Sequence, residues 1–120
     1  MKGSSRRPEQ VAETIRQVVA DALTRGEVRD PRVGLVTVTR VDVSGDLSHA
    51  RVYISPQGDE EARERAIEGL QSAAGFLRGL VAKVLTTRTV PELHIELDKG
   101  MQHAARINQL LADLKGEADG

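Results

Sequence analysis

The segment of residues 70–97 constrains the fold more than any other part of the chain. Apolar residues recur at helical spacing on both sides of the small residues Ala73, Ala74 and Gly75. Because glycine weakens a helix interior by about 1 kcal/mol relative to alanine, this pattern predicts two helices joined by a kink rather than one straight helix. After Pro91, apolar and polar residues alternate, which predicts a short strand.

The same part of the chain carries charge of one sign. Residues 69–91 contain no acidic residue, whereas Arg78, Lys83 and Arg88 lie within them. Elsewhere acids and bases are interleaved, and residues 59–68, for example, hold five acids and two arginines. A nucleic-acid ligand requires positive charge gathered on one face, so the acid-free stretch is the predicted phosphate-binding region.

The composition indicates one soluble domain of 120 residues. A net charge of -1 with 29% charged residues excludes a nonspecific polycation. The absence of cysteine excludes disulfides, thiolate nucleophiles and cysteine-ligated zinc, and it suits a reducing cytosol. No apolar run approaches the roughly 20 residues of a membrane span, and residues 1–10 lack the apolar core of a secretory signal. We therefore expect a cytoplasmic protein, and a monomer.

The first half of the chain predicts a helix followed by a hairpin. Pro8 suits a first helical turn, and the apolar stripe that follows ends near Gly26. Residues 33–43 are dense in Val and Thr with apolar side chains at both parities, which predicts a central or well-covered strand. Residues 50–54 alternate strictly, and the turn chemistry of residues 44–46 makes the pair an antiparallel hairpin.

The second half completes an α+β fold. Acids at residues 59–61 mark the start of the second helix, and a last helix is predicted over residues 104–114. The predicted order is α-β-β-α-(kink)-α-β with a three-stranded sheet and a possible C-terminal helix, which forms a two-layer domain. We expect a flexible basic arm over residues 1–7, a domain over residues 8–114 and a tail over residues 115–120.

This order is that of type II K-homology domains, and the resemblance narrows to one family. Four segments resemble, in order and spacing, the ribosome-binding factor A family of bacterial small-subunit assembly factors: DPRVGLVTVTRVDVSGDLSHARVYIS (30–55), LQSAAGFLRGLVAKVL (70–85), RTVPELHIELD (88–98) and HAARINQLL (103–111). In that family an Ala-x-Gly kink stands where RNA-binding K-homology relatives have Gly-x-x-Gly. Ala73, Ala74 and Gly75 fall on that position.

The resemblance implies a K-homology-like fold and a non-enzymatic role. A member of this family binds immature or free 30S subunits through 16S rRNA. It assists late 30S maturation, including processing of the 16S rRNA 5′ end, leaves before translation and matters for growth in the cold. Two alternatives stay open: a protein-interaction module that docks by its sheet edge or last helix without RNA contact, and a small-ligand regulatory domain.

The residues themselves limit how RNA could be bound. The chain has no Gly-x-x-Gly, and its only aromatic residues are Tyr53 and Phe76, too few for a stacking platform. Phe76 is expected in the core because it adjoins Leu77. Recognition must then rest on phosphate contacts, and the candidate RNA-binding residues are Lys2, Arg6, Arg7, Arg78, Lys83 and Arg88. The alternative for the basic residues is that they are solvated surface charges without a ligand. The alternative for Ala73, Ala74 and Gly75 is that small residues only let two helices pack closely.

Catalytic and metal sites are not predicted. His49, His94 and His103 lack metal-ligand spacing, and strand alternation places the first two on the surface. The acids that could form carboxylate pairs occupy turn and strand-end positions typical of solvated groups; they are Asp42, Asp46, Glu96 and Asp98. The sequence also lacks a phosphate-cradling glycine loop. We expect no enzymatic activity, no cofactor, no metal and no small-molecule substrate.

Overall fold

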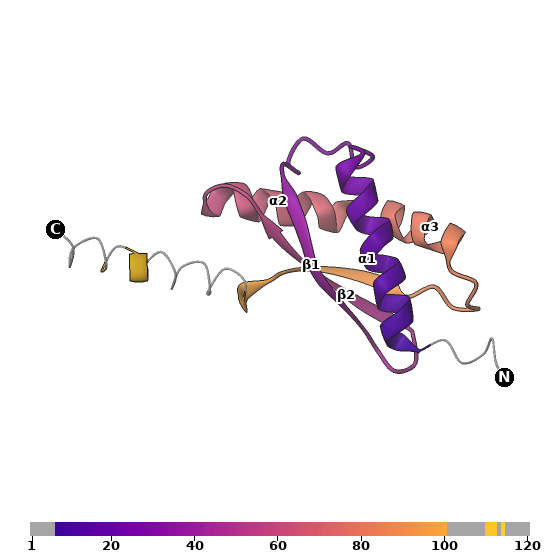
Figure 1. Ribbon diagram of the computed structural model, residues 1–120. Coiled ribbons are helices and arrows are strands. Elements are labelled where there is room, and N and C mark those ends of the chain that lie inside the picture. Colours follow the sequence, from indigo (N-terminus) through magenta and orange to yellow (C-terminus); the bar gives the residue numbers. More distant parts are fainter. Residues whose placement is uncertain (1–6, 101–109, 113, 115–120) are drawn as a thin grey trace.

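The computed structural model describes residues 7–100, 110–112 and 114 (Figure 1). The predicted order of elements is confirmed: α1 (Pro8–Thr24), β1 (Val36–Val43), β2 (His49–Pro56), α2 (Glu60–Ser72), α3 (Ala74–Val84) and β3 (Glu92–Leu97). Of the predicted last helix, residues 110–112 and 114 are described and are helical. Its remainder, residues 1–6 of the predicted arm and residues 115–120 of the predicted tail lie outside the described residues.

The sheet is mixed and three-stranded, with β2 in the centre. β2 pairs with β1 in antiparallel orientation and with β3 in parallel orientation. A parallel neighbour requires a crossover, and the two helices α2 and α3 supply it, running almost end to end beside the sheet in Figure 1. The sheet residues that point to the helices are buried and form the sheet side of the core: Val41, Ala50, Val52, Ile54, Leu93 and Ile95.

The helices cover one face of this sheet and leave the other open. α1 packs on β1 and α3, α2 packs on β2 and β3, and α3 packs on β3. The α1 side chains that face the core are at most 1% exposed and recur at helical spacing; they are Val11, Ile15, Val19 and Ala22. On the opposite face of the sheet, His49, Arg51 and Glu92 are exposed. The expected two-layer α+β class is confirmed.

The prediction that residues 33–43 form a central or well-covered strand is wrong, because β1 is an edge strand and Val41 is its only buried residue. The register along β1 shifts between Val38 and Arg40, which leaves a bulge at Thr39. A bulge changes the phase of the side chains by one residue. Val36 and Val38 before the bulge therefore face the same side as the apolar residues after it. Apolar residues at both parities thus belong to a one-sided strand with a bulge.

The described helices do not include one long and apolar enough to cross a membrane.

Candidate nucleic-acid interface

The crossover is broken where the small residues predicted it. α2 ends at Ser72 and α3 begins at Ala74, with Ala73 between them at φ -88° and ψ 0°. The first turn of α3 contains no acidic residue, and its N-cap residue, Ala73, makes no side-chain hydrogen bond to the backbone N–H groups of that turn. The start of a helix carries partial positive charge and N–H groups without intrahelical partners. The start of α3 therefore has neither a side-chain cap nor an acid, but the carbonyl end of α2 lies one residue before it and opposes its dipole.

Gly75 is not the residue that positions the break. A methyl group built at Gly75 meets no atom within 4 Å, and the same is true of Gly79. The interpretation of Ala73, Ala74 and Gly75 as small residues that let two helices pack closely therefore finds no support at Gly75. Both glycines face open space and leave the surface of α3 without a side chain at their positions.

Gly69 is the glycine that a close contact requires. A methyl group there would lie 2.8 Å from Val33 Cγ2 and 3.3 Å from the Arg32 Cβ and Asp30 Cγ atoms. The loop of residues 30–33 therefore presses directly on α2, less than one turn before the break. Sequence reasoning missed this residue, although Gly69 lies on the same helical stripe as the buried Ala66.

The loop is also tied to the end of α2 by polar contacts. The Asp30 carboxylate accepts from Arg32 Nε at 3.0 Å and from Arg32 Nη2 at 2.6 Å. These bonds, and one from the Arg32 backbone N–H, lower the pKa of Asp30 to about 2. Arg32 Nη2 donates further to Ser72 Oγ at 3.2 Å. The last residue of α2 is thereby fixed to the loop that precedes β1.

The predicted basic residues do not all have the same surroundings. Arg78 donates from Nη2 to the Val90 carbonyl at 2.8 Å and from Nε to the Pro91 carbonyl at 3.2 Å. It holds the loop after α3 against the helix, so its charge is partly engaged. Lys83, in the last turn of α3, and Arg88, in that loop, are exposed.

The basic residues predicted on the N-terminal arm are only partly described. Arg7 is exposed and is the N-cap residue of α1. Lys2 and Arg6 lie outside the described residues. Arg78 and Lys83 therefore lie on α3 and Arg88 on the loop that follows it, whereas Arg7 caps another helix.

The expectation that Phe76 lies in the core is wrong, because its side chain is 48% exposed. Leu77 points into the core and is fully buried, whereas Phe76 lies about 100° around the helix and points away from it. Phe76 instead lines a hollow of about 530 Å³ together with residues 27–30 and the end of α2. It offers one aromatic face beside the break, enough to stack a single base.

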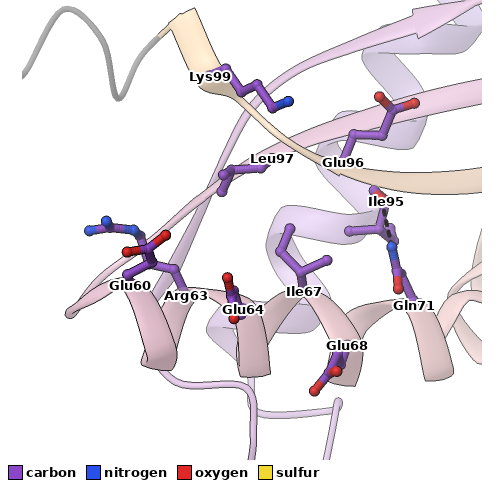
Figure 2. A pocket seen from close by; sticks show the side chains of 10 residues that line it. All are labelled: Glu60, Arg63, Glu64, Ile67, Glu68, Gln71, Ile95, Glu96, Leu97 and Lys99. Carbon is purple, nitrogen blue, oxygen red and sulfur yellow. Dashed lines mark hydrogen bonds between the residues drawn. The ribbon is translucent and has the colours of Figure 1, made fainter.

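A second hollow, of about 540 Å³, lies between α2 and β3 (Figure 2). Figure 2 shows Ile67 rising from α2 toward the strand that carries Ile95 and Leu97. Four carboxylates and two cations surround this apolar floor: Glu60, Glu64, Glu68 and Glu96, with Arg63 and Lys99. An excess of negative charge disfavours phosphate there.

The groups considered for catalysis are solvated or engaged. Asp42 lies 3.4 Å from Arg40, and Glu96 lies 3.5 Å from Arg51. The Asp46 carboxylate accepts from the Ser48 and Ser44 hydroxyls, which lower its pKa to about 2. Asp98 accepts from the Thr39 hydroxyl.

The histidines of β2 and β3 lie on the open face of the sheet, as alternation predicted, and they meet. His49 Nδ1 is 3.0 Å from His94 Nε2. The sequence spacing of these residues did not indicate the contact, because it depends on the parallel register between β2 and β3.

These features define a class of protein first: a small two-layer α+β domain of αββααβ order whose crossover helix is broken at a small-residue motif. Within that class, the chain belongs to the ribosome-binding factor A family, because that family's model matches residues 7–111.

Known members of the family are similar over nearly their whole length. Ribosome-binding factor A of Thermomicrobium roseum is 47% identical over 94% of this chain and 87% of its own. The crystal structure of ribosome-binding factor A from Thermus thermophilus superposes with a TM-score of 0.63 at 26% identity, covering 75% of this chain and 94% of that one. A homology model of the Thermus thermophilus protein, fitted into a cryo-EM map of its complex with the 30S subunit, gives a TM-score of 0.59 at 27% identity, covering 74% and 92%.

Proposed function

We propose that this protein is a non-enzymatic assembly factor of the small ribosomal subunit. It binds the free or immature 30S subunit through 16S rRNA, acts in the cytoplasm and works as a monomer. The observation that carries the proposal is membership of the ribosome-binding factor A family over residues 7–111. The neighbour fitted into the map of a 30S complex supports the same partner for this chain.

The face offered to RNA is the one built by α3 and the loop after it. Lys83 and Arg88 are exposed cations there, and no acidic residue lies between Gly69 and Pro91 to oppose them. Arg78 acts differently, because its guanidinium holds the backbone of residues 90–91. It positions the loop that carries Arg88.

The mode of action is differential binding. A protein that prefers one conformation of a folded RNA shifts the population toward it, by no more than its difference in affinity for the two conformations. Preference for the immature 16S rRNA conformation would assist late maturation, including processing at the 5′ end. It would also explain release before translation and a greater need for the factor in the cold, where misfolded RNA rearranges slowly. In this proposal residues 1–7 serve as a basic arm that adds positive charge for RNA, and residues 8–114 serve as the domain.

Co-sedimentation tests the partner. The pure protein is mixed with free 30S subunits, with 30S subunits from cells arrested in maturation, and with assembled 70S ribosomes. We expect binding to the first two and much weaker binding to the third. Equal binding to all three, or to none, would sink the proposal.

A second candidate is docking on a ribosomal protein without RNA contact. The observation that favours it is Leu35, which is 80% exposed and directly precedes the edge strand β1. Titration with protein-free 16S rRNA separates the two candidates. RNA binding that falls steeply with salt supports the leading proposal, whereas binding to 30S subunits with none to the naked RNA supports the alternative.

A further inference from the structure

Three potential metal ligands converge on the open face of the sheet, where β2 and β3 both begin. His49 Nδ1 lies 3.0 Å from His94 Nε2 and 3.8 Å from Glu92 Oε2. One donor atom from each of the three residues lies within 4.8 Å of the other two. The imidazole rings are tilted by 41° with their centroids 5.1 Å apart. The two nitrogens therefore face each other at hydrogen-bond distance, and an ion that displaced the shared proton would find two ligands side by side.

The separations suit a tetrahedral ion. Imidazole nitrogen binds Zn²⁺ at about 2.0–2.1 Å and carboxylate oxygen at about 2.0–2.2 Å, which puts neighbouring donors of a tetrahedron roughly 3.4 Å apart. The 3.0 Å and 3.8 Å separations bracket that value. Small rotations of exposed side chains are enough to centre an ion, and His49 and Glu92 are 56% and 65% exposed.

The backbone, rather than the side chains, brings the group together. In the parallel register His49 lies opposite Glu92, and His94 follows two residues later on the same face of β3. The strand starts are fixed, since Glu92 N–H donates to the Ser48 carbonyl at 2.9 Å and His49 N–H donates to Ser44 Oγ at 3.0 Å. The fold thus holds the three Cα positions with no ion needed.

The surrounding charges permit a cation. The nearest base on this face is Arg51, the register partner of His94. Its guanidinium lies 3.5 Å from the Glu96 carboxylate, which offsets its charge. Both histidines line a hollow of about 570 Å³. An ion held by three protein donors would keep a further coordination position open toward that hollow.

We propose that His49, Glu92 and His94 bind a divalent transition-metal ion of the Zn²⁺ type. Two imidazoles and one carboxylate suit such borderline ions, whereas Mg²⁺ and Ca²⁺ prefer an all-oxygen shell. The bound ion joins the starts of β2 and β3, which the chain connects only through the whole α2–α3 crossover. It is a site separate from the α3 surface and does not depend on the proposed function.

Titration of the full, tag-free chain with Zn²⁺ in competition with a chromophoric chelator tests the site. We expect one ion per chain, with the affinity lowered at least about tenfold by His49→Gln, Glu92→Gln or His94→Gln, since loss of even an outer-shell partner costs about 10–100-fold. His103→Gln removes the only other histidine and is the matched control. Excess Mg²⁺ should not compete. Unchanged affinity in the three variants, an equal loss in the control, or displacement by Mg²⁺ overturns the proposal.

Two further readouts keep the result independent of folding. Co²⁺ in place of Zn²⁺ should give visible absorption of low-coordinate character in the wild type and not in His94→Gln. Zn²⁺ should raise the Tm of the wild type and leave that of His94→Gln unchanged, because an ion stabilises only a folded state that binds it. Because none of the three ligands is buried, the variants should keep the wild-type circular dichroism. A Tm that rises equally in wild type and His94→Gln contradicts the site.

Discussion

The two halves of the crossover differ although one short connection joins them. α2 has a side-chain cap, because the Asp59 carboxylate accepts from the Ala62 N–H at 2.8 Å, and its buried Gly69 lies against the loop of residues 30–33. α3 has no side-chain cap, carries no acid in its first turn, and leaves Gly75 and Gly79 against open space.

The contrast extends to charge. The side of α2 that faces β3 is lined mostly by carboxylates, whereas residues 69–91 have none. Each helix still buries one leucine side chain completely, Leu70 in α2 and Leu77 in α3, so both helices contribute to the core. The difference teaches that α2 is fixed near both of its ends, by the Asp59 cap and by the loop of residues 30–33, while α3 combines a buried stripe with a surface left open for a partner.

The largest expected effect separates the buried stripe of α3 from its open surface. Leu77→Ala should lower the free energy of unfolding by about 2–5 kcal/mol, because it leaves a cavity under the helix. Phe76→Ala, at the adjacent half-exposed position, should cost well under half of that. Urea unfolding measures both. If Phe76→Ala is as destabilising as Leu77→Ala, then Phe76 belongs to the core and α3 has no open aromatic.

The second prediction tests which half meets RNA. Replacing Lys83 and Arg88 with Gln should weaken 30S binding by about 1.5–3 kcal/mol, the scale of hydrogen bonds to charged groups. It should also reduce the slope of log affinity against log salt by roughly 1.5, since each phosphate contact contributes about 0.7–0.9.

The control variant removes the same charge from the rim of the acidic hollow between α2 and β3. Arg63 and Lys99 border the acidic hollow, and changing both to Gln should leave affinity and slope as in the wild type. Filter binding at several salt concentrations compares the two double variants. Equal losses in both would mean that overall charge, and not the α3 surface, attracts the RNA.

Much of the fold was predictable because the patterns that specify it are local. Helical spacing located α1, strict alternation located β2 and β3, and the small residues around Ala73 located the break. The position of β1 was not predictable, since the bulge at Thr39 made a one-sided strand look two-sided. Which strand lies in the centre is likewise decided by long-range pairing that no window of sequence contains.

The candidate site was predictable in charge but not in contacts. The acid-free stretch could be read directly, whereas the bonds from Arg78 to the Val90 and Pro91 carbonyls depend on how the loop returns to α3. The meeting of His49 with His94 depends on strand register. Gly69 was visible in the buried stripe of α2, but the loop against it was not. The remaining predictions concern the contact between Gly69 and the loop of residues 30–33, which anchors the end of α2.

Gly69→Ala should destabilise the protein and thereby show that the anchor matters. A methyl group 2.8 Å from Val33 Cγ2 forces the loop or the helix to move, and overpacking of this kind costs about 1–3 kcal/mol. The better helix propensity of alanine returns up to about 1 kcal/mol. We expect a net loss of about 1–2 kcal/mol in urea unfolding. A gain in stability would mean that the loop is not pressed on α2.

Gly75→Ala should have the opposite sign. The position is helical, has no positive φ and offers open space, so alanine should stabilise the protein by about 0.5–1 kcal/mol. The same variant places a methyl group on the α3 surface and should weaken 30S binding if RNA approaches that helix closely. Measured together, Gly69→Ala and Gly75→Ala form a matched pair. Destabilisation by Gly75→Ala would show that the kink needs its glycine.

The smallest expected effect is the change in the free energy of unfolding at low pH, where the Asp30 carboxylate in the loop of residues 30–33 becomes protonated. Asp30 has a pKa of about 2 in the folded protein, against about 3.9 in an unfolded chain. A folded pKa below the unfolded one means that the Asp30–Arg32 contact stabilises the protein fully above about pH 4 and that this contribution disappears as the pH falls toward 2. Asp30→Asn should therefore flatten the fall of stability across that window in urea unfolding.

Asp46→Asn is the matched control, because Asp46 also has a pKa of about 2 but lies in the hairpin turn. It should flatten the same window by a similar amount, since each carboxylate loses its own hydrogen bonds on protonation. The two variants should differ at neutral pH: only Asp30→Asn loosens the link through Arg32 to Ser72, and only it should weaken 30S binding. If both variants bind as the wild type does, the loop of residues 30–33 stabilises α2 without positioning the start of α3.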